Sequence, residues 1–176
     1  GGVAGYTTHT IVEFLQSPPR DGVTSLFQSL RILDLSGNLL GDEASARILE
    51  MVFLPSSSHN IERLDLSRNG IKKGHAVKRT LQECASSKPK LEVLNMAKNE
   101  LGFGDVASDV VYSLAGVLSS LTSLDLSSNL LTGEVLDRLG GILIGNSRLQ
   151  VLNVSDNQFS KSSVESLTSM LYRAIK

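Results

Sequence analysis

The 176-residue sequence has one cysteine, no tryptophan and few aromatic residues, and each shortage limits what the protein can be. Because Cys84 is the only cysteine, no disulfide can form within the chain, which favours a reducing, intracellular compartment. The aromatic content of 5% is too low for a surface that stacks nucleic-acid bases. No apolar run approaches the length of a membrane span, and no signal-peptide pattern opens the chain. We therefore expect no membrane association.

Neither sign of charge is in excess, since the net charge is -1. A near-neutral total gives no general reason to expect nucleic acid or an anionic membrane surface as the partner. Hydrophobic residues make up 41% and charged residues 20%, which is typical of a folded domain and not of a disordered chain. The length is ample for one domain with its own core.

Residues that carry catalysis or bind metals are also sparse. His9, His59 and His75 lie far apart with no nucleophile or ligand cluster at a useful spacing, and one cysteine cannot build a zinc site. The stretch around Gly70 lacks the Gly-Lys-Ser/Thr ending of a phosphate-binding loop. We interpret Cys84 as a small packed hydrophobe. The sequence therefore predicts no enzyme activity, no cofactor and no metal.

What the sequence does contain is an internal repeat. Five segments align without gaps to the pattern L-x-x-L-x-L-x-x-N-x-L, and their starts are 31, 30, 30 and 28 residues apart. The segments are LRILDLSGNLL (30–40), IERLDLSRNGI (61–71), LEVLNMAKNEL (91–101), LTSLDLSSNLL (121–131) and LQVLNVSDNQF (149–159). The alternation within each is the period of a short strand, so we expect parallel strands from successive repeats to line one face.

The apolar positions of the pattern predict three buried columns. They are Leu33, Leu64, Leu94, Leu124 and Leu152; then Leu35, Leu66, Met96, Leu126 and Val154; then Leu40, Ile71, Leu101, Leu131 and Phe159. A polar column follows the strands, formed by Asn38, Asn69, Asn99, Asn129 and Asn157. A side-chain amide at a buried corner must be hydrogen-bonded, and it can satisfy backbone groups where the chain leaves the sheet. We expect these asparagines to be structural and not to form a binding site.

The segments between the strands predict outer helices, because their apolar residues recur at helical spacing. The expected helices are Glu43–Phe53, His75–Ala85, Asp105–Leu118, Glu134–Leu143 and Val164–Ile175. For the last of these, Ser162 with Glu165 three residues later predicts a capping box. Gly41, Gly102 and Gly133 lie near the turns into these helices.

Repeats of this length with a full outer helix resemble the ribonuclease-inhibitor class of leucine-rich repeats. The class includes ribonuclease inhibitor, the sensing domains of nucleotide-binding leucine-rich-repeat receptors, Ran GTPase-activating protein, and the actin regulators tropomodulin and CARMIL. The resemblance implies an α/β fold, a right-handed leucine-rich-repeat solenoid or horseshoe with a parallel concave β-sheet and convex α-helices. It also implies a role in protein–protein recognition. Extracellular members usually close their ends with disulfide-bonded caps, which one cysteine cannot form.

The repeat also suggests the domain organisation. We expect five repeats over 30–176, with boundaries 30–60, 61–90, 91–120, 121–148 and 149–176. Residues 1–29 resemble the back half of a further, partial or degenerate repeat, with Thr10–Gln16 as its outer helix and Gly22–Ser29 as the return to Leu30. No L-x-L strand precedes that helix. A half-repeat without its strand indicates a fragment of a larger protein. The alternative is a naturally short domain with degenerate ends.

Two variable columns of the concave face are the best candidates for binding a partner. The first outward positions are Ile32, Arg63, Val93, Ser123 and Val151, and the positions at the strand exits are Gly37, Arg68, Lys98, Ser128 and Asp156. We predict that Ile32 and Val93 supply apolar contact, while Arg63, Arg68 and Lys98 supply charge-assisted hydrogen bonds.

The two remaining outward columns are polar. They are Asp34, Asp65, Asn95, Asp125 and Asn153, and Ser36, Ser67, Ala97, Ser127 and Ser155. The carboxylates of Asp34, Asp65 and Asp125 suggest an acidic groove for a basic partner. The alternative is that short polar residues simply suit a crowded concave sheet.

Charge is also segregated along the chain. Residues 68–90 contain seven Lys or Arg and one acid, whereas residues 99–137 contain six acids and no Lys or Arg. Lys72, Lys73, Lys78 and Arg79 therefore form a possible basic patch on the outer side. The alternative is a loosely constrained, solvated helix surface.

The leading hypothesis is a protein-recognition module of an intracellular multidomain protein, with another protein as its partner. A structural spacer, with weak self-association through exposed terminal repeats, is a second hypothesis. A GTPase-activating or actin-regulating leucine-rich-repeat protein is a third. Binding of nucleic acid through the basic stretch 68–90 would fall steeply with salt, but the acidic neighbours make it unfavourable.

Overall fold

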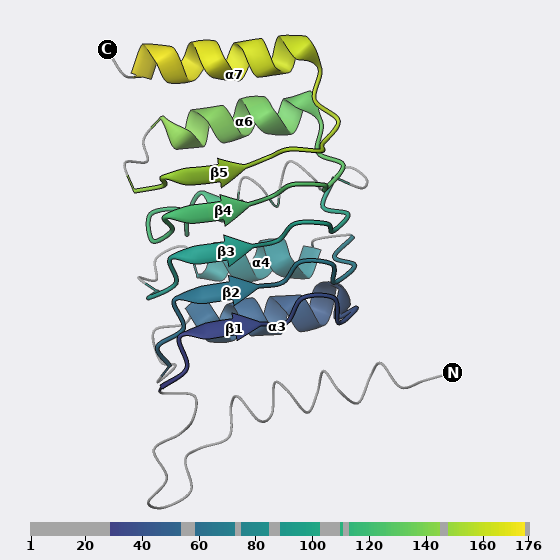
Figure 1. Ribbon diagram of the computed structural model, residues 1–176, viewed down its shortest axis with the longest axis vertical. Helices are drawn as coiled ribbons and strands as arrows, with labels where there is room; N and C mark the ends of the chain where they lie inside the picture. The colour runs from purple at the N-terminus through teal and green to yellow at the C-terminus, as the bar shows by residue number, and fades with distance from the viewer. Residues whose placement is uncertain are drawn as a thin grey trace, which may run out of the picture.

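The computed structural model describes residues 29–53, 59–72, 75–84, 89–102, 110, 113–144 and 148–174. Five three-residue strands form one parallel sheet in sequence order: β1 (Ile32–Asp34), β2 (Arg63–Asp65), β3 (Val93–Asn95), β4 (Ser123–Asp125) and β5 (Val151–Asn153) (Figure 1). Their register pairs Leu33 with Leu64, then Leu94, Leu124 and Leu152. Equivalent motif residues therefore lie side by side. The half-repeat predicted at 1–29 falls almost wholly outside the described residues.

Helices connect the strands on the other side of the core. They are α3 (Gly41–Phe53), α4 (His75–Glu83), α6 (Gly133–Leu143) and α7 (Lys161–Ala174). Helix α3 packs beside α4, and α6 packs beside α7. In Figure 1, α3 and α4 lie behind β1 to β3. The predicted α/β leucine-rich-repeat solenoid, with a parallel sheet and outer helices, is confirmed.

The predicted helix over 105–118 is shorter at its C-terminal end than expected. Among its described residues, Val110, Ser113 and Leu114 are helical, while residues 115–120 form turns. The backbone tightens there, because the N–H of Val117 donates to the carbonyl of Leu114, three residues earlier, at 3.0 Å. Leu114 and Val117 are nevertheless fully buried, so the apolar spacing identified the buried face correctly.

The capping box predicted at Ser162 is wrong. Helix α7 begins at Lys161, and Ser160 precedes it. The backbone N–H of Ser163 donates to the Ser160 hydroxyl at 3.1 Å, which satisfies one of the free donors of the first helical turn. Several serines in a row offered more than one possible cap, and the path of the chain out of β5 selected the earlier one.

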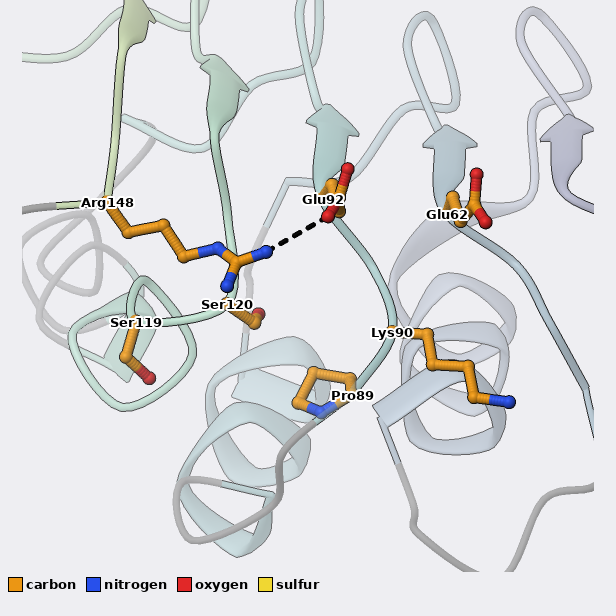
Figure 2. Close-up of a pocket in the computed structure, with 7 residues that line it drawn as sticks. All are labelled: Glu62, Pro89, Lys90, Glu92, Ser119, Ser120 and Arg148. Atoms are coloured by element: carbon orange, nitrogen blue, oxygen red, sulfur yellow. Dashed lines mark hydrogen bonds and ion pairs between the residues drawn. The ribbon is translucent and has the colours of Figure 1, made fainter.

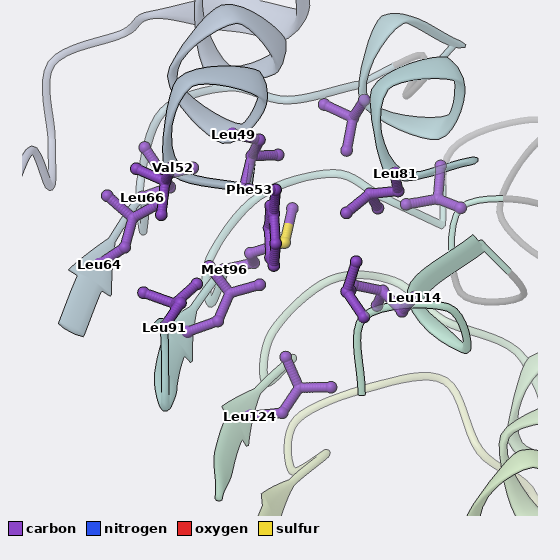
Figure 3. Packing of buried hydrophobic residues seen from close by; sticks show 14 of the residues in the cluster. Leu49, Val52, Phe53, Leu64, Leu66, Leu81, Leu91, Met96, Leu114 and Leu124 are labelled. Carbon is purple, nitrogen blue, oxygen red and sulfur yellow. The ribbon is translucent and has the colours of Figure 1, made fainter. Parts of the chain in front are cut away.

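The apolar columns form one continuous core between sheet and helices (Figure 3). Leu64, Leu94 and Leu124 from the strands are at most 1% exposed, and Phe53 from α3 packs among them with no exposure. Leu33 and Leu152, in the outermost strands, are only half-buried. The predicted columns are confirmed, and burial is deepest where a described repeat lies on both sides.

The asparagine column bonds each repeat to the one before it, as expected. The Asn99 side-chain oxygen accepts from the backbone N–H of Asn69 at 3.0 Å and of Ile71 at 3.2 Å. Its amide nitrogen donates to the carbonyl oxygens of Leu66 at 3.1 Å and Met96 at 2.9 Å. Asn69 and Asn129 repeat this arrangement, accepting from the N–H of Leu40 and of Leu101 respectively, and are fully buried. These hydrogen bonds hold successive repeats together and use the side-chain amides that a ligand would need.

Candidate binding surface

The first outward column forms a row across the concave sheet. The strand register places Ile32 beside Arg63, then Val93, Ser123 and Val151. Ile32 is 61% exposed and Val151 56% exposed, and Arg63 is also exposed, while Val93 and Ser123 are half-buried. The row therefore presents aliphatic side chains on both sides of one cation.

The carboxylates of the acidic column are largely engaged in hydrogen bonds within the protein. Each of Asp34, Asp65 and Asp125 accepts a hydrogen bond from the backbone N–H two residues later, at 2.8 to 2.9 Å. This bond, donated by Ser36, holds the pKa of Asp34 below its usual value. Asp65 also accepts from the Asn95 amide at 2.7 Å, and Asp125 from the Asn153 amide at 2.9 Å. Short polar residues in this column therefore stabilise the strand exits.

The third column does not face outward in the way the sequence suggested. Ser67, Ala97 and Ser127 are buried, with at most 9% of each residue exposed, and only Ser36 and Ser155 in the outer repeats are exposed. The strands end at the second column, so these residues lie in the turns that follow. Successive turns stack on one another there, which buries the inner members of the column.

The fourth column is held in the left-handed backbone region throughout. Arg68, Lys98, Ser128 and Asp156 have φ between 54° and 57°, and Gly37 has φ 71°. This conformation aims each N–H at the next repeat: the N–H of Arg68 donates to the carbonyl of Ala97 at 3.1 Å, and that of Lys98 to the carbonyl of Ser127 at 2.9 Å. The Arg68 and Lys98 side chains are left exposed.

The three predicted cations of the concave side are uncompensated within the part of the chain that the structure describes. Neither Arg63, Arg68 nor Lys98 makes an ion pair or a side-chain hydrogen bond there. Several cations elsewhere are paired: Arg31 with Glu62, Lys72 with Glu100, Arg138 with Glu134, Arg148 with Glu92, and Lys161 with Glu165. The concave side thus combines free positive charges with aliphatic surface.

The possible basic patch of the convex side is less uniform than its sequence. Lys72 lies 3.2 Å from Glu100 of the following repeat, so the acidic stretch neutralises part of the basic one. Lys78 is half-buried on α4 and Arg79 beside it is exposed. Lys73 lies outside the described residues.

Two exposed leucines on the strand-exit edge were not singled out from the sequence. Leu39 is 75% exposed with φ 53°, and Leu130 is 39% exposed with φ 61°. Each precedes a residue of the third apolar column, Leu40 or Leu131. Two adjacent leucines do not show by sequence alone which of them is buried. The variable position after each asparagine was the signal that could have identified them.

A surface depression at the strand-entry edge was also missed (Figure 2). It has a volume of about 470 Å³ and is lined by Glu62, Pro89, Lys90, Glu92, Ser119, Ser120 and Arg148. Arg148 reaches across the fourth repeat to Glu92 at 2.9 Å, and the Lys90 ammonium donates to the Asn60 side chain at 2.5 Å. Glu62 pairs with Arg31, so each of these charged side chains already has a partner, which makes the depression a weaker binding candidate than the concave side.

The residues that suggested chemistry in the sequence are used for packing. His59 is buried, and its ring lies 3.1 Å from the Met51 carbonyl through Nε2 while Nδ1 accepts from the N–H of Ile61 at 3.1 Å. Burial lowers the pKa of His59 and raises that of Cys84, which is 1% exposed in the core. Among the described residues, no three His, Cys, Asp or Glu side chains are grouped so as to hold a metal ion, and no helix is long and apolar enough to cross a membrane.

Comparison with known proteins agrees with the fold. One leucine-rich-repeat family model matches residues 120–142 and 148–170, and a second matches residues 28–44 and 57–73. No curated protein matches the sequence. Together with the stacked strands, these matches show that the repeats are leucine-rich repeats.

Two solved structures are similar in different degrees. The tropomodulin C-terminal domain of Caenorhabditis elegans has 17% identity and a TM-score of 0.62, over 96% of this chain and 93% of that chain. An internalin of Listeria monocytogenes has 19% identity and a TM-score of 0.44, over 81% of this chain and 47% of that chain. The first likeness supports the fold alone. Leucine-rich repeats generally mediate protein–protein interaction, which is the general function that the class supports.

Proposed function

We propose that the chain is a protein-recognition module that binds its partner on the concave sheet and the adjoining strand-exit loops. The observation that carries the proposal is the set of exposed, uncompensated cations Arg63, Arg68 and Lys98. Arg63 lies between exposed Ile32 and half-buried Val93 on the neighbouring strands, and Arg68 and Lys98 lie in the strand-exit loops. Apolar contact surrounded by free charge-assisted donors is typical of an interface.

The proposal places the acidic residues at the border of the interface. The carboxylates of Asp34, Asp65 and Asp125 accept hydrogen bonds from backbone N–H groups. Substituting them would therefore disturb the strand exits as well as the binding of a partner. The convex residues Lys72, Lys78 and Arg79 are not part of the proposed surface. The single cysteine supports an intracellular location for the module.

The test compares two double charge reversals of equal size. Arg63→Glu with Arg68→Glu alters the concave side, while Arg47→Glu with Arg79→Glu alters exposed positions on helices α3 and α4. Proteins crosslinked to the full chain in cell extract are quantified for each variant, with circular dichroism and melting temperature as checks of folding. We expect the concave variant alone to lose specific partners, by about tenfold or more. If the folded concave variant captured the same partners as the wild-type chain, the concave side would be excluded as the binding surface.

Self-association is tested separately. Sedimentation velocity at several concentrations shows whether the chain forms dimers through its outer strands. A concentration-independent monomer would remove the spacer hypothesis in its self-associating form. Since the likeness to tropomodulin rests on 17% identity, we do not extend the proposal to actin regulation.

A further inference from the structure

We propose that the strand-exit edge selects an extended, acidic segment of the partner that carries an aliphatic side chain at each end. This inference rests on the proposed function and specifies the chemistry of the partner. It is based on four exposed residues from four successive repeats: Leu39, Arg68, Lys98 and Leu130.

The exit loops of the four repeats are stacked at one edge of the sheet (Figure 1). Arg68 and Lys98 directly precede the motif asparagine of their loops, and Leu39 and Leu130 directly follow the asparagine of theirs. Backbone bonds join these loops: the N–H of Gly37 donates to the carbonyl of Ser67 at 2.8 Å, and the next two loops are joined through Arg68 and Lys98. Adjacent strands in a sheet are about 4.8 Å apart. The loops of Leu39 and Leu130 are three such steps apart, or about 15 Å.

The two aliphatic ends are energetically unfavourable in the free protein. A bulky residue with positive φ is uncommon, because its Cβ lies too close to the following carbonyl oxygen in this conformation. At the equivalent position the second repeat has Gly70, with φ 67°, which adopts this backbone without strain. Leu39 and Leu130 instead combine this strain with exposed apolar surface. The exposed apolar surface is left uncovered by the described chain, and a bound aliphatic side chain would cover it.

The middle of the row favours carboxylates. The Arg68 and Lys98 side chains are exposed and uncompensated within the described part of the chain. The acids closest along the repeat are engaged, since Glu100 pairs with Lys72 and both Asp65 and Asp125 accept backbone N–H groups. Asp156 lies one repeat beyond Leu130, where it would repel an acidic segment that extended further. From the first to the fourth repeat, the strand-exit edge therefore presents an apolar, a positive, a positive and an apolar side chain.

The length of the row defines the segment. An extended chain rises about 3.3 Å per residue, so a span of about 15 Å corresponds to four or five residues. Alternate side chains of an extended chain face the same side, so the two aliphatic side chains must be four positions apart, with Asp or Glu between them. A basic segment would meet unpaired cations, and a helix, at about 1.5 Å per residue, would need twice as many residues to span the row.

The experiment uses a labelled peptide of defined sequence with the full chain. Its central segment is Leu-Asp-Glu-Asp-Leu between Gly-Ser flanks, and the matched control peptide replaces Asp and Glu by Asn and Gln. Fluorescence anisotropy gives the two dissociation constants. We expect the acidic peptide to bind at least about tenfold more tightly, and its affinity to fall with added salt. The variant Arg68→Gln/Lys98→Gln should abolish this difference.

A second variant tests the aliphatic ends without endangering the fold. Asparagine tolerates the left-handed region, so Leu39→Asn/Leu130→Asn removes the apolar surface while relieving strain. We expect about tenfold weaker peptide binding with an unchanged or higher melting temperature. Arg47→Gln/Arg79→Gln on the convex helices is the matched control for the cation variant and should bind the acidic peptide normally.

Three results would overturn the inference: no binding of the acidic peptide, equal binding of acidic and neutral peptides, or equal binding by the wild-type chain and both exit-edge variants. Each leaves the proposed function intact if the concave charge reversal still removes the partners captured from extract. Conversely, if peptide binding follows the exit-edge variants but the concave reversal leaves partner capture unchanged, the proposed function fails and the peptide site alone remains.

Discussion

At the scale of single residues, the most regular polar side chains are the least available for binding. The buried asparagines and the acidic column both satisfy backbone groups at the strand exits. Arg63, Arg68 and Lys98, by contrast, occupy positions at which the repeat requires no particular side chain. Regularity in this fold therefore indicates a structural role, and function is to be sought among the variable positions.

The asparagine column gives a residue-scale prediction. Asn99→Ala would leave the buried backbone N–H groups of Asn69 and Ile71 without their acceptor. We expect a loss of about 2–4 kcal/mol in the free energy of unfolding, measured by urea denaturation. Asn38→Ala is the matched control: Asn38 is exposed, and we expect a loss below about 1 kcal/mol. If both variants lost a similar free energy of unfolding, the hydrogen bonds of the asparagine column between repeats would not be the source of stability.

His59 gives a prediction of pH dependence. Burial lowers its pKa below the ordinary 6.5, because a charged ring is disfavoured there and Nδ1 must accept from the N–H of Ile61. The unfolded chain therefore binds the proton more readily than the folded one. The contribution to stability is complete above about pH 6.5 and is lost as the pH falls from 6.5 through the lower, folded pKa.

We expect the melting temperature to fall between pH 7 and pH 5, and His59→Gln to flatten that part of the profile. His75→Gln, at an exposed position on α4, is the control and should leave the profile unchanged. A pH profile that is the same in the wild type and the His59 variant would show that other groups cause the acid sensitivity.

At the scale of elements, the repeat places successive loops and helices so close that some positions admit no side chain. A Cβ on Gly102 would lie 2.1 Å from the carbonyl oxygen of Leu130, in the next exit loop. The same loops are joined by a hydrogen bond from the Gly102 N–H to the Asn129 carbonyl at 2.7 Å. On α6, by contrast, a Cβ on Gly141 would meet no atom within 4 Å.

One substitution is therefore expected to have opposite effects at these two glycines. Gly102→Ala should lower the free energy of unfolding by about 1–3 kcal/mol, because a backbone neighbour must move. Gly141→Ala should raise it by about 0.5–1 kcal/mol, because alanine favours the helix and nothing obstructs it. Thermal and urea unfolding measure both. Equal effects at the two sites would show that the close approach of the third and fourth exit loops does not constrain the fold.

At the scale of the whole molecule, stability depends on having neighbours on both sides. The leucines of the central strands are fully buried, whereas Leu152 in β5 is half-buried. In a stack, each repeat contacts chiefly its neighbours, so the cost of a deletion depends on its place in the stack.

Leu94→Ala and Leu152→Ala test this dependence at equivalent motif positions. We expect about 3–5 kcal/mol of destabilisation for Leu94→Ala, since the cavity would be enclosed between repeats. For Leu152→Ala we expect about half as much, because part of the side chain is already in water. Equilibrium unfolding of the full chain provides the comparison, and equal losses would argue against a graded core.

The motif predicted most of the fold because its information is local and repeated. The apolar columns, the asparagines and the parallel strands follow from spacing within eleven residues and its recurrence. The same spacing identified which residues share a row of the concave sheet, since equal motif positions fall in register. Arg63 and Ile32 are adjacent for that reason.

Other features depend on contacts that the motif does not encode. The burial of Ser67 and Ala97 follows from turns stacked on one another, and the pairing of Arg148 with Glu92 spans a whole repeat between them. The cap at Ser160 depended on where the chain leaves β5. None of these has a fixed local spacing by which it could be recognised.

The sequence by itself determined the solenoid, its core and its polar ladder, because each repeats a short pattern whose physical requirements are the same five times over. Only the tertiary structure decided which charges remain uncompensated and which leucine of each pair stays in water. Those outcomes depend on neighbours about thirty residues away and on the left-handed backbone of the exit loops. The surface that we propose for recognition therefore emerges from stacking, although every residue in it occupies a variable position of the motif.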